Sequence, residues 1–158
     1  MKKLLYQQLT DFLLTKLPLA YQAKLTSNIT QGEIVNNGRN VTEKGIELFH
    51  FPYSAVFYFD EFPYREISTA DLMAWIQIWL LENDLNRSDL ELSNPKMEIE
   101  ILDDATAIIA FDIEFYEPIE AIEDVNGNLE FGNKKYRLAQ IDIAVAEQVS
   151  EVVNVVDD

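Results

Sequence analysis

Carboxylates are the side chains of this sequence best suited to chemistry, because 28 Asp and Glu outnumber 12 Lys and Arg. The adjacent pair Asp103-Asp104 offers the two acids that a glycoside hydrolase uses. This pair stands between two predicted strands, where aspartate commonly forms turns, and we interpret it as a turn. Asp60, Glu61 and Glu66 offer oxygen ligands to calcium, but they lack the fixed spacing of a calcium-binding loop.

Other catalytic groups are scarce. Cysteine is absent from the sequence, which excludes disulfides, thiol catalysis and thiolate metal sites. His50 is the single histidine, and we interpret it as a strand residue that hydrogen-bonds to a neighbour. The five glycines are scattered singly and form no phosphate-binding loop. We therefore predict that the protein is not an enzyme and uses neither a cofactor nor a metal.

The net charge of −16 argues against a conventional DNA-binding domain, since such a surface repels the nucleic-acid backbone. Three explanations of this charge stay open. The surface keeps the protein soluble, it lets DNA pass close by without adhering, or it imitates DNA and occupies a basic partner.

No membrane partner is expected. No uninterrupted apolar run approaches the roughly 18 residues that cross a bilayer. Polar residues Tyr6, Gln7 and Gln8 interrupt the apolar stretch that a signal peptide needs after Lys2-Lys3. We expect a cytoplasmic product.

The first half of the chain predicts a helix followed by strands. Apolar residues recur at helical spacing from Lys2 to Leu17, and Pro18 ends the pattern. A short strand over 32–35 is predicted to run into a turn at 36–38. Strict alternation predicts a long strand over 45–60, and Pro52 places it at a sheet edge or at a bulge. Its buried face is predicted to comprise Phe49, Phe51, Tyr53, Ala55, Phe57 and Phe59.

The clearest predicted helix begins after Ser68, where Asp71 three residues later resembles a capping box. Between Leu72 and Leu81 only Gln77 is polar, so the helix is apolar nearly all round. Such a helix is buried on more than one side. The second side is covered either by another subunit or by the sheet and the first helix together. Trp75 and Trp79 are therefore candidate assembly contacts.

Two candidate contact surfaces come from the strands and their loops. Two alternating strands are joined at Asp103-Asp104 and end at Pro118, and together they carry one acidic face. There are three alternatives for this face: it is solvated, it lines a channel, or it meets a basic partner. That face comprises Glu98, Glu100, Asp112 and Glu114. The loop from Asp60 to Glu66 is either an ordinary connection or a recognition loop. Its candidate contacts are Asp60, Glu61, Tyr64, Arg65 and Glu66.

The remaining chain predicts a hairpin at Asn126-Gly127 and then further alternation over 138–145. We expect one domain over 1–158, with a core of 1–135 and a divergent C-terminal strand or arm over 136–158. The fold class is α+β, an antiparallel or mixed sheet with two main helices packed on one face.

The order of these elements resembles the tail completion protein R (GpR) family of contractile-tailed phages and prophages. The resemblance covers residues 1 to about 131 and departs after about Lys135. It is carried by the following segments: GIELFHFPYSAVFYFDEF (45–62), ADLMAWIQIWLLENDLN (70–86), MEIEILDDATAIIAFDIEFYEPI (97–119) and DVNGNLEF (124–131).

The resemblance implies a structural tail terminator and carries over no catalytic residue. Such a protein forms a ring with itself, a hexamer by analogy with contractile-tail symmetry, and stops polymerisation of the tube and sheath. It presents a surface to the head-neck connector while DNA passes through without specific binding. It would assemble in the bacterial cytoplasm and end at the neck-proximal end of the virion tail. An acidic DNA mimic that inhibits a host nucleic-acid-binding protein is the alternative.

Overall fold

The computed structural model describes residues 2–36, 40–41 and 45–140, and they form an α+β fold with an antiparallel sheet. The strand order is β1-β3-β5-β7-β6, with β2 paired to β3 and β4 paired to β5. This confirms the predicted fold class. The elements in chain order are α1 (Leu5–Lys16), the 3-10 helix η1 (Leu19–Lys24), β1 (Leu25–Gly32), β2 (Asn40–Val41), β3 (Gly45–Phe62), α2 (Thr69–Asn83), β4 (Lys96–Ile101), β5 (Ala107–Glu123), β6 (Leu129–Phe131) and β7 (Lys134–Leu138).

Contacts divide the chain into two compact units, each containing part of β3 and of β5. We call residues 5–34 and 51–117 the helical unit. The described residues of 1–4, 35–50 and 118–158 form the hairpin unit. The expectation of a single domain with a divergent 136–158 segment stays a prediction, and residues 141–158 lie outside the described part of the chain.

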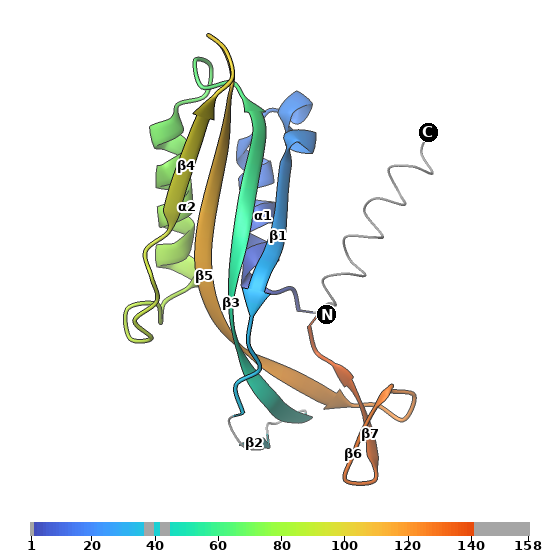
Figure 1. Ribbon diagram of the computed structural model, residues 1–158. Helices are drawn as coiled ribbons and strands as arrows, with labels where there is room; N and C mark the ends of the chain where they lie inside the picture. The colour runs from blue at the N-terminus through green and yellow to red at the C-terminus, as the bar shows by residue number, and fades with distance from the viewer. Residues whose placement is uncertain (1, 37–39, 42–44, 141–158) are drawn as a thin grey trace. The chain divides into compact units, whose positions relative to one another are not determined.

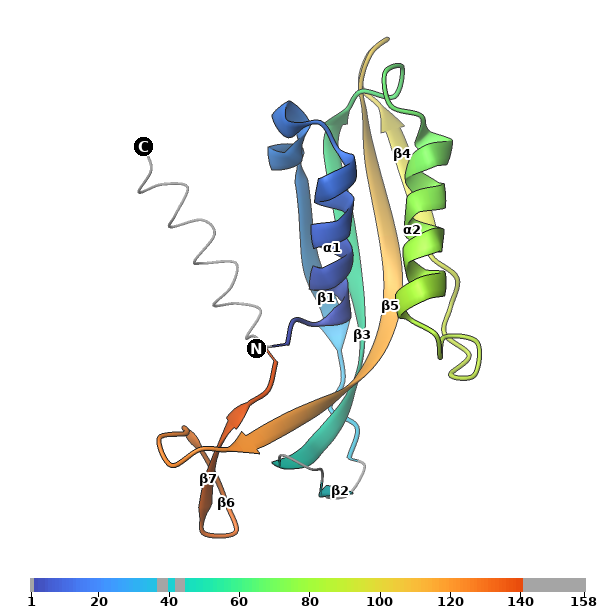
Figure 2. The ribbon, with the colours of Figure 1, turned by 180° about the vertical axis from the view of Figure 1, so that it is seen from behind.

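The helical unit places both α-helices on one face of four strands in the order β1-β3-β5-β4 (Figures 1 and 2). Helix α1 buries Tyr6, Leu9 and Leu13 at the predicted spacing. The strands bury every second residue against the helices, as their alternation predicts. These residues are Tyr53, Ala55, Phe57 and Phe59 of β3 and Ile109, Phe111, Ile113 and Phe115 of β5. Phe49 and Phe51, predicted to be buried with them, are only half-buried.

Aromatic rings from β3 and β5 interlock in this core. The ring of Phe115 stacks on Tyr53 with centroids 5.5 Å apart and meets Phe57 edge-on at 6.5 Å. Phe59 meets Phe111 edge-on at 6.1 Å. Such pairs each contribute about 0.5–1.5 kcal/mol beyond the burial of their area. The helical unit is therefore a rigid support for the surface residues that it carries.

The hairpin unit has a small core of its own. Ile46, Ala121 and Tyr136 are buried, and Leu48 and Leu129 pack against them. A side chain at Gly45 would meet the backbone oxygen of Ala121 at 1.9 Å, so glycine is needed for this close approach.

Strand β3 is central, so of the two alternatives predicted from Pro52, an edge or a bulge, the edge is wrong. It lies between β1 and β5 and also pairs with β2. The regular pairing with β1 stops at Tyr53, next to Pro52, and the Pro52 carbonyl accepts from Glu33 N at 3.1 Å. A proline is tolerated at this point because the chain requires no ladder donor there.

The end of β3 also differs from the prediction, since the strand runs to Phe62 and only 63–68 forms the connection to α2. Glu61 adopts a left-handed backbone with φ of 45°. This breaks the alternation, so that both Phe59 and Phe62 are fully buried, with their rings 5.9 Å apart.

Pro118 does not end β5, which continues to Glu123. On one edge, β5 pairs with β4 through Asp112 and with β7 only from Ala121 onward. Pro118 lies between these two ladders, where a missing N–H costs no ladder hydrogen bond.

The C-terminal hairpin is one turn later than predicted. Asn126-Gly127 forms a turn held by Asp124, but β5 and β6 on its two sides do not pair with each other. The paired strands are β6 and β7, joined by Gly132-Asn133 with φ of 59° and 67°. Two successive positive φ angles are what a two-residue hairpin turn requires.

Sequence patterns also missed β1 and η1, whose segment is too mixed to show a period. The strand predicted over 32–35 is wrong, because β1 ends at Gly32 and Val35 forms an isolated bridge with His50. Residues 37–38 of the predicted turn at 36–38 lie outside the described residues. The expected alternation after Leu138 lies mostly in the segment 141–158, which the structure does not describe.

The predicted cap of α2 is confirmed, because Ser68 Oγ accepts from the backbone N–H of Asp71 at 3.3 Å. Substituting Ser68→Ala is expected to lower the free energy of unfolding by about 1 kcal/mol, because an N-terminal N–H loses its acceptor. Urea denaturation measures this, with Ser88→Ala in an exposed turn as the matched control. Equal midpoints for the two variants would show that the cap contributes nothing.

Candidate assembly surfaces

The predicted recognition loop is braced against the β4–β5 hairpin. Tyr64 Oη donates to the backbone oxygen of Asp103 at 2.8 Å, and Arg65 Nε donates to that of Asp104. The Arg65 guanidinium also lies 5.5 Å from the centre of the Tyr64 ring. The loop is therefore held in one conformation, which favours a defined contact surface.

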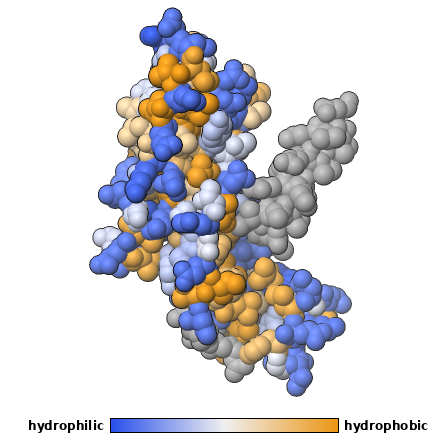
Figure 3. Space-filling view, in the orientation of Figure 1, coloured by the Kyte–Doolittle hydropathy of each residue, from blue (hydrophilic) through white to orange (hydrophobic). Residues whose placement is uncertain are grey.

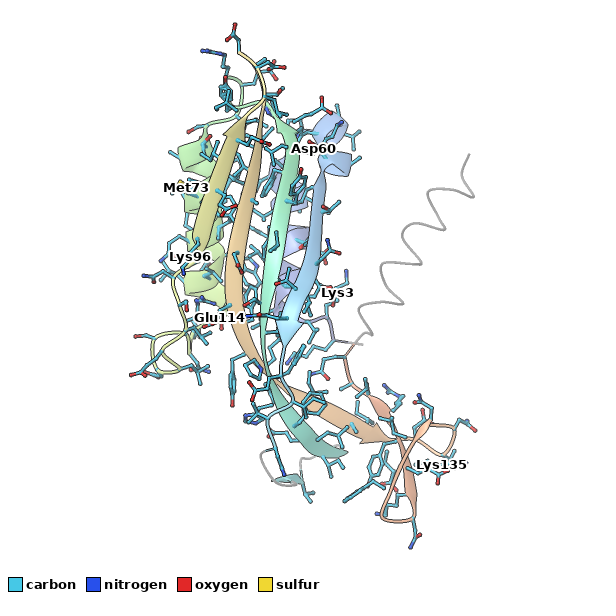
Figure 4. The ribbon with its side chains drawn as sticks, in the orientation of Figure 1. Lys3, Asp60, Met73, Lys96, Glu114 and Lys135 are labelled. Atoms are coloured by element: carbon cyan, nitrogen blue, oxygen red, sulfur yellow. The ribbon has the colours of Figure 1, made fainter. Side chains whose placement is uncertain are left out.

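The acidic residues Asp60 and Glu61 of the predicted recognition loop lie beside η1. Tyr21 Oη donates to the Asp60 carbonyl at 2.6 Å, and burial, followed by the charges of Asp60 and Glu61, raises the pKa of that hydroxyl. Glu61 pairs with Lys24 at 2.7 Å on the surface. Glu66 is exposed. Asp60, Glu61, Tyr64, Arg65 and Glu66 thus share one end of the helical unit, where Figure 4 labels Asp60.

The acidic pair Asp103-Asp104 behaves as the turn that was predicted. One oxygen of Asp103 accepts from the N–H groups of Ala105 and Thr106 and from the Thr106 hydroxyl, at 2.7–3.0 Å. These bonds lower the pKa of the Asp103 carboxyl. The predicted neighbour of His50 is Glu47, at 3.0 Å. Among the described residues, no three His, Cys, Asp or Glu side chains gather closely enough to hold a metal ion.

The four acidic candidates of the strand pair lie on the sheet face opposite the helices. Lys96 pairs with Asp112, Glu98 with Ala110 and Glu100 with Ile108. The register therefore sets no two of these carboxylates directly opposite each other. Glu114, at the far end of the face from Asp60 (Figure 4), accepts from Ser93 N at 3.0 Å.

The rest of this open face is mixed. Residues between the buried positions of β3 and β5 point to it, among them Val56, Tyr58, Ile108 and Ala110. Figure 3 views this face and shows hydrophilic and hydrophobic residues interspersed. The acids therefore form one margin of the face and not a uniform negative surface.

Helix α2 is buried along one face only. Its buried residues are Leu72, Ile76, Trp79 and Leu80. Met73, Ile78 and Leu81 on other sides are 45%, 47% and 63% exposed. The sheet and α1 therefore cover one side of α2 in a single chain and leave the rest of its apolar surface open. Trp79 belongs to the core, whereas Trp75 is half-buried and accessible.

A groove of about 360 Å³ lies between α2 and β4. The buried residues Ile76 and Phe111 line the groove. Met73 of α2 and Met97 of β4 line it as well. Figure 4 shows Met73 and Lys96 along this side of the helical unit. Sequence analysis missed the groove because it depends on how α2 packs beside β4.

Comparison with known proteins assigns this chain to a family. The family model of the P2 phage tail completion protein R (GpR) matches residues 1–157. The chain belongs to this GpR family. A protein of Haemophilus phage HP1, described as an uncharacterized 19.2 kDa protein in the rep-hol intergenic region, is 47% identical over 154 residues, which cover 98% of this chain and 93% of that protein. No solved structure matches the chain.

The GpR family is a family of phage tail proteins, so a tail-completion role follows from membership. The match confirms the resemblance and extends it beyond Phe131, through the C-terminal segment where sequence analysis placed a departure. In the described part of the chain, no helix is both long enough and apolar enough to span a bilayer.

Two buried networks position the surfaces of this GpR protein, and sequence analysis found neither. In the first, one oxygen of Glu117 accepts from Leu5 N at 2.9 Å and from the hydroxyl of Tyr53. The Tyr53 oxygen in turn accepts from Tyr6 N at 3.2 Å. Burial, followed by the charge of Glu117, raises the pKa of the Tyr53 hydroxyl. The network thus caps the N-terminus of α1.

The second network holds the connection between α2 and β4. Arg87 Nη1 donates to the buried Asp84 carboxylate at 2.9 Å and to the Glu114 carbonyl at 2.6 Å. Arg87 Nη2 donates to the Ser93 carbonyl at 3.0 Å, and the guanidinium lies 5.7 Å from the centre of the Phe115 ring. One side chain therefore ties the connection to β5.

Proposed function

We propose that this protein is a structural, non-enzymatic tail terminator that caps the head-proximal end of the tail tube as a homo-oligomeric ring, a hexamer. Its partners are copies of itself, the tail tube, the sheath and the head-neck connector, and it enables head-tail joining. The observation that carries the proposal, together with GpR membership, is the apolar surface of α2 that a single chain leaves open.

The physical argument starts from the cost of that surface. Met73, Ile78 and Leu81 on α2 are joined by Ile99 and Ile101 on β4, which are 47% and 61% exposed. Contiguous exposed apolar residues on neighbouring elements are typical of protein interfaces. Burying them against another subunit stabilises a ring by removing apolar area from water.

The charge of the protein fits a ring through which DNA moves. A net charge of −16 repels phosphate, so DNA would pass the subunits without adhering. The acidic margin formed by Glu98, Glu100, Asp112 and Glu114 is the candidate for the wall of this channel. The braced segment from Asp60 to Glu66, which comprises the end of β3 and the start of the connection to α2, is the candidate contact with the tube or the connector.

The test is deletion of the gene from the phage or prophage that carries it. Assembly in the host cytoplasm is expected to yield tails of uncontrolled length that do not join heads, since nothing stops tube growth. Electron microscopy measures tail length, and mass spectrometry of purified virions should find the protein at the neck-proximal end of intact tails.

Normal-length, head-competent tails in the absence of the protein would contradict the proposal. The DNA-mimic alternative predicts a different pattern, in which the protein is absent from virions and binds a basic host protein in a salt-sensitive manner.

A further inference from the structure

Strand β4 is an edge of the sheet in the helical unit. It pairs with β5 on one side, and among the described residues no strand pairs with its other side. An open edge presents unpaired backbone N–H and C=O groups that can template the addition of a further strand. Natural proteins protect such edges with charges or cover them. Here the charged residues Lys96, Glu98 and Glu100 lie on the open face, whereas the helix-facing side chains of the edge are Met97, Ile99 and Ile101, which are apolar.

The groove beside α2 continues this edge. It is lined by Met73, Met97 and Phe111, among others, on the same side of β4 as Ile99 and Ile101. An added strand would therefore find backbone partners along β4 and an apolar groove for every second side chain. This combination calls for a segment that alternates apolar and small or polar residues.

Residues 141–158 of the chain itself have this character. Eight of the 18 are Ile or Val, and the segment contains no proline or glycine. Ile141, Ile143 and Val145 alternate with Asp142, Ala144 and Ala146. β-branched residues favour strands, and the alternation suits one apolar face. The GpR family model includes this segment, since it matches through residue 157.

We propose that residues 141–158 of one copy add as a strand to the β4 edge of a second copy, with Ile141, Ile143 and Val145 in the groove beside α2. The inference rests on the proposed ring and names its subunit contact. Because donor segment and acceptor edge are different surfaces, the contact is head-to-tail, and such contacts form a ring when the rotation between neighbours closes.

Charge and length fit this pairing. If Asp142 lies beside Lys96, then Ala144 lies beside Glu98 and Ala146 beside Glu100, so the pairing opposes no like charges at these positions. The edge has 6 residues, the same number as residues 141–146, which follow Gln140 directly.

Disulfide trapping tests the proposal, since the natural chain has no cysteine. Two full-length variants, Glu98→Cys and Ala144→Cys, are expressed together in the deletion strain, and their tails are purified and oxidised. The expected product is a disulfide-linked dimer that joins the two variants. The Ile101→Lys substitution in the Glu98→Cys chain is expected to abolish this dimer, because a charge enters the apolar side of the edge. Ser88→Cys in place of Glu98→Cys is the control and should give no dimer with Ala144→Cys.

A third variant carries Glu98→Cys and Ala144→Cys in the same chain. A disulfide that forms only within single chains of this variant would overturn the proposal, as would the absence of any disulfide in assembled tails. Complementation separates this failure from failure of the proposed function. If the wild-type gene does not restore tail length, the tail-terminator role fails. If a chain lacking 141–158 restores it as well as wild type does, only the strand exchange fails.

Discussion

Replacing Glu117 with alanine is expected to lower the free energy of unfolding by about 3 kcal/mol. Residue Glu117 is 4% exposed, and its carboxylate accepts from Leu5 N and from Tyr53 Oη. Without it, a buried hydroxyl and the first N–H of α1 lose their acceptor away from water. Urea denaturation followed by circular dichroism measures the effect.

The partner variants separate the contributions of this network. Glu117→Gln keeps an acceptor oxygen and should cost less than Glu117→Ala. Tyr53→Phe removes only the hydroxyl, and in a double-mutant cycle with Glu117→Ala the coupling should be about 0.5–3 kcal/mol. Strictly additive effects of the two substitutions would show that the hydroxyl and the carboxyl do not stabilise each other.

The Arg87→Ala substitution is the second change for which we expect a large effect, a loss of about 3 kcal/mol in the free energy of unfolding. The side chain of Asp84, its ion-pair partner, is 7% exposed and would be left as a buried charge without its cation. The carbonyls of Ser93 and Glu114 would also lose a donor. Hydrogen exchange of residues 84–95 should rise together with the loss of stability, because the connection is released from β5.

Two matched arginine variants test this interpretation. Arg87→Lys keeps the charge but not the planar fork, so it should recover only part of the stability. Arg65→Ala removes an exposed arginine that also bonds a carbonyl, and its effect should be much smaller. If Arg65→Ala destabilises as much as Arg87→Ala does, burial of the ion pair is not the cause.

Local pattern was enough to predict the elements that make the core. The period-two apolar positions of β3 and β5 and the three-and-four spacing of α1 predicted which residues face inward. The cap of α2 was predicted because Ser68 and Asp71 are close in sequence and bond locally. The fold class follows from these elements, since one apolar sheet face needs the apolar faces of helices to cover it.

Partner strands could not be predicted in the same way. Pro52 was interpreted as the mark of a sheet edge or a bulge and Pro118 as a strand end, yet both lie within long strands at points where a ladder stops. Whether a proline breaks a strand depends on whether its missing N–H has a partner, and the sheet order decides that. The hairpin at Gly132-Asn133 was missed for a related reason, because Asn126-Gly127 has the favoured composition but joins strands that do not pair.

The buried network of Glu117 depends on tertiary structure entirely, whereas the Arg87 network also contains a local pair, with Asp84 three positions before Arg87. Leu5 and Glu117 are 112 positions apart and Tyr6 and Tyr53 are 47 apart, and no local rule joins them. The same holds for the surface of α2. The sequence of α2 by itself determined that this helix, apolar nearly all round, needs packing partners on more than one side. The reason is that the free-energy cost of exposed apolar area depends on composition. Only the packing of α2 against the sheet and α1 decided which side stays open, and that side is the one where we propose the next subunit binds.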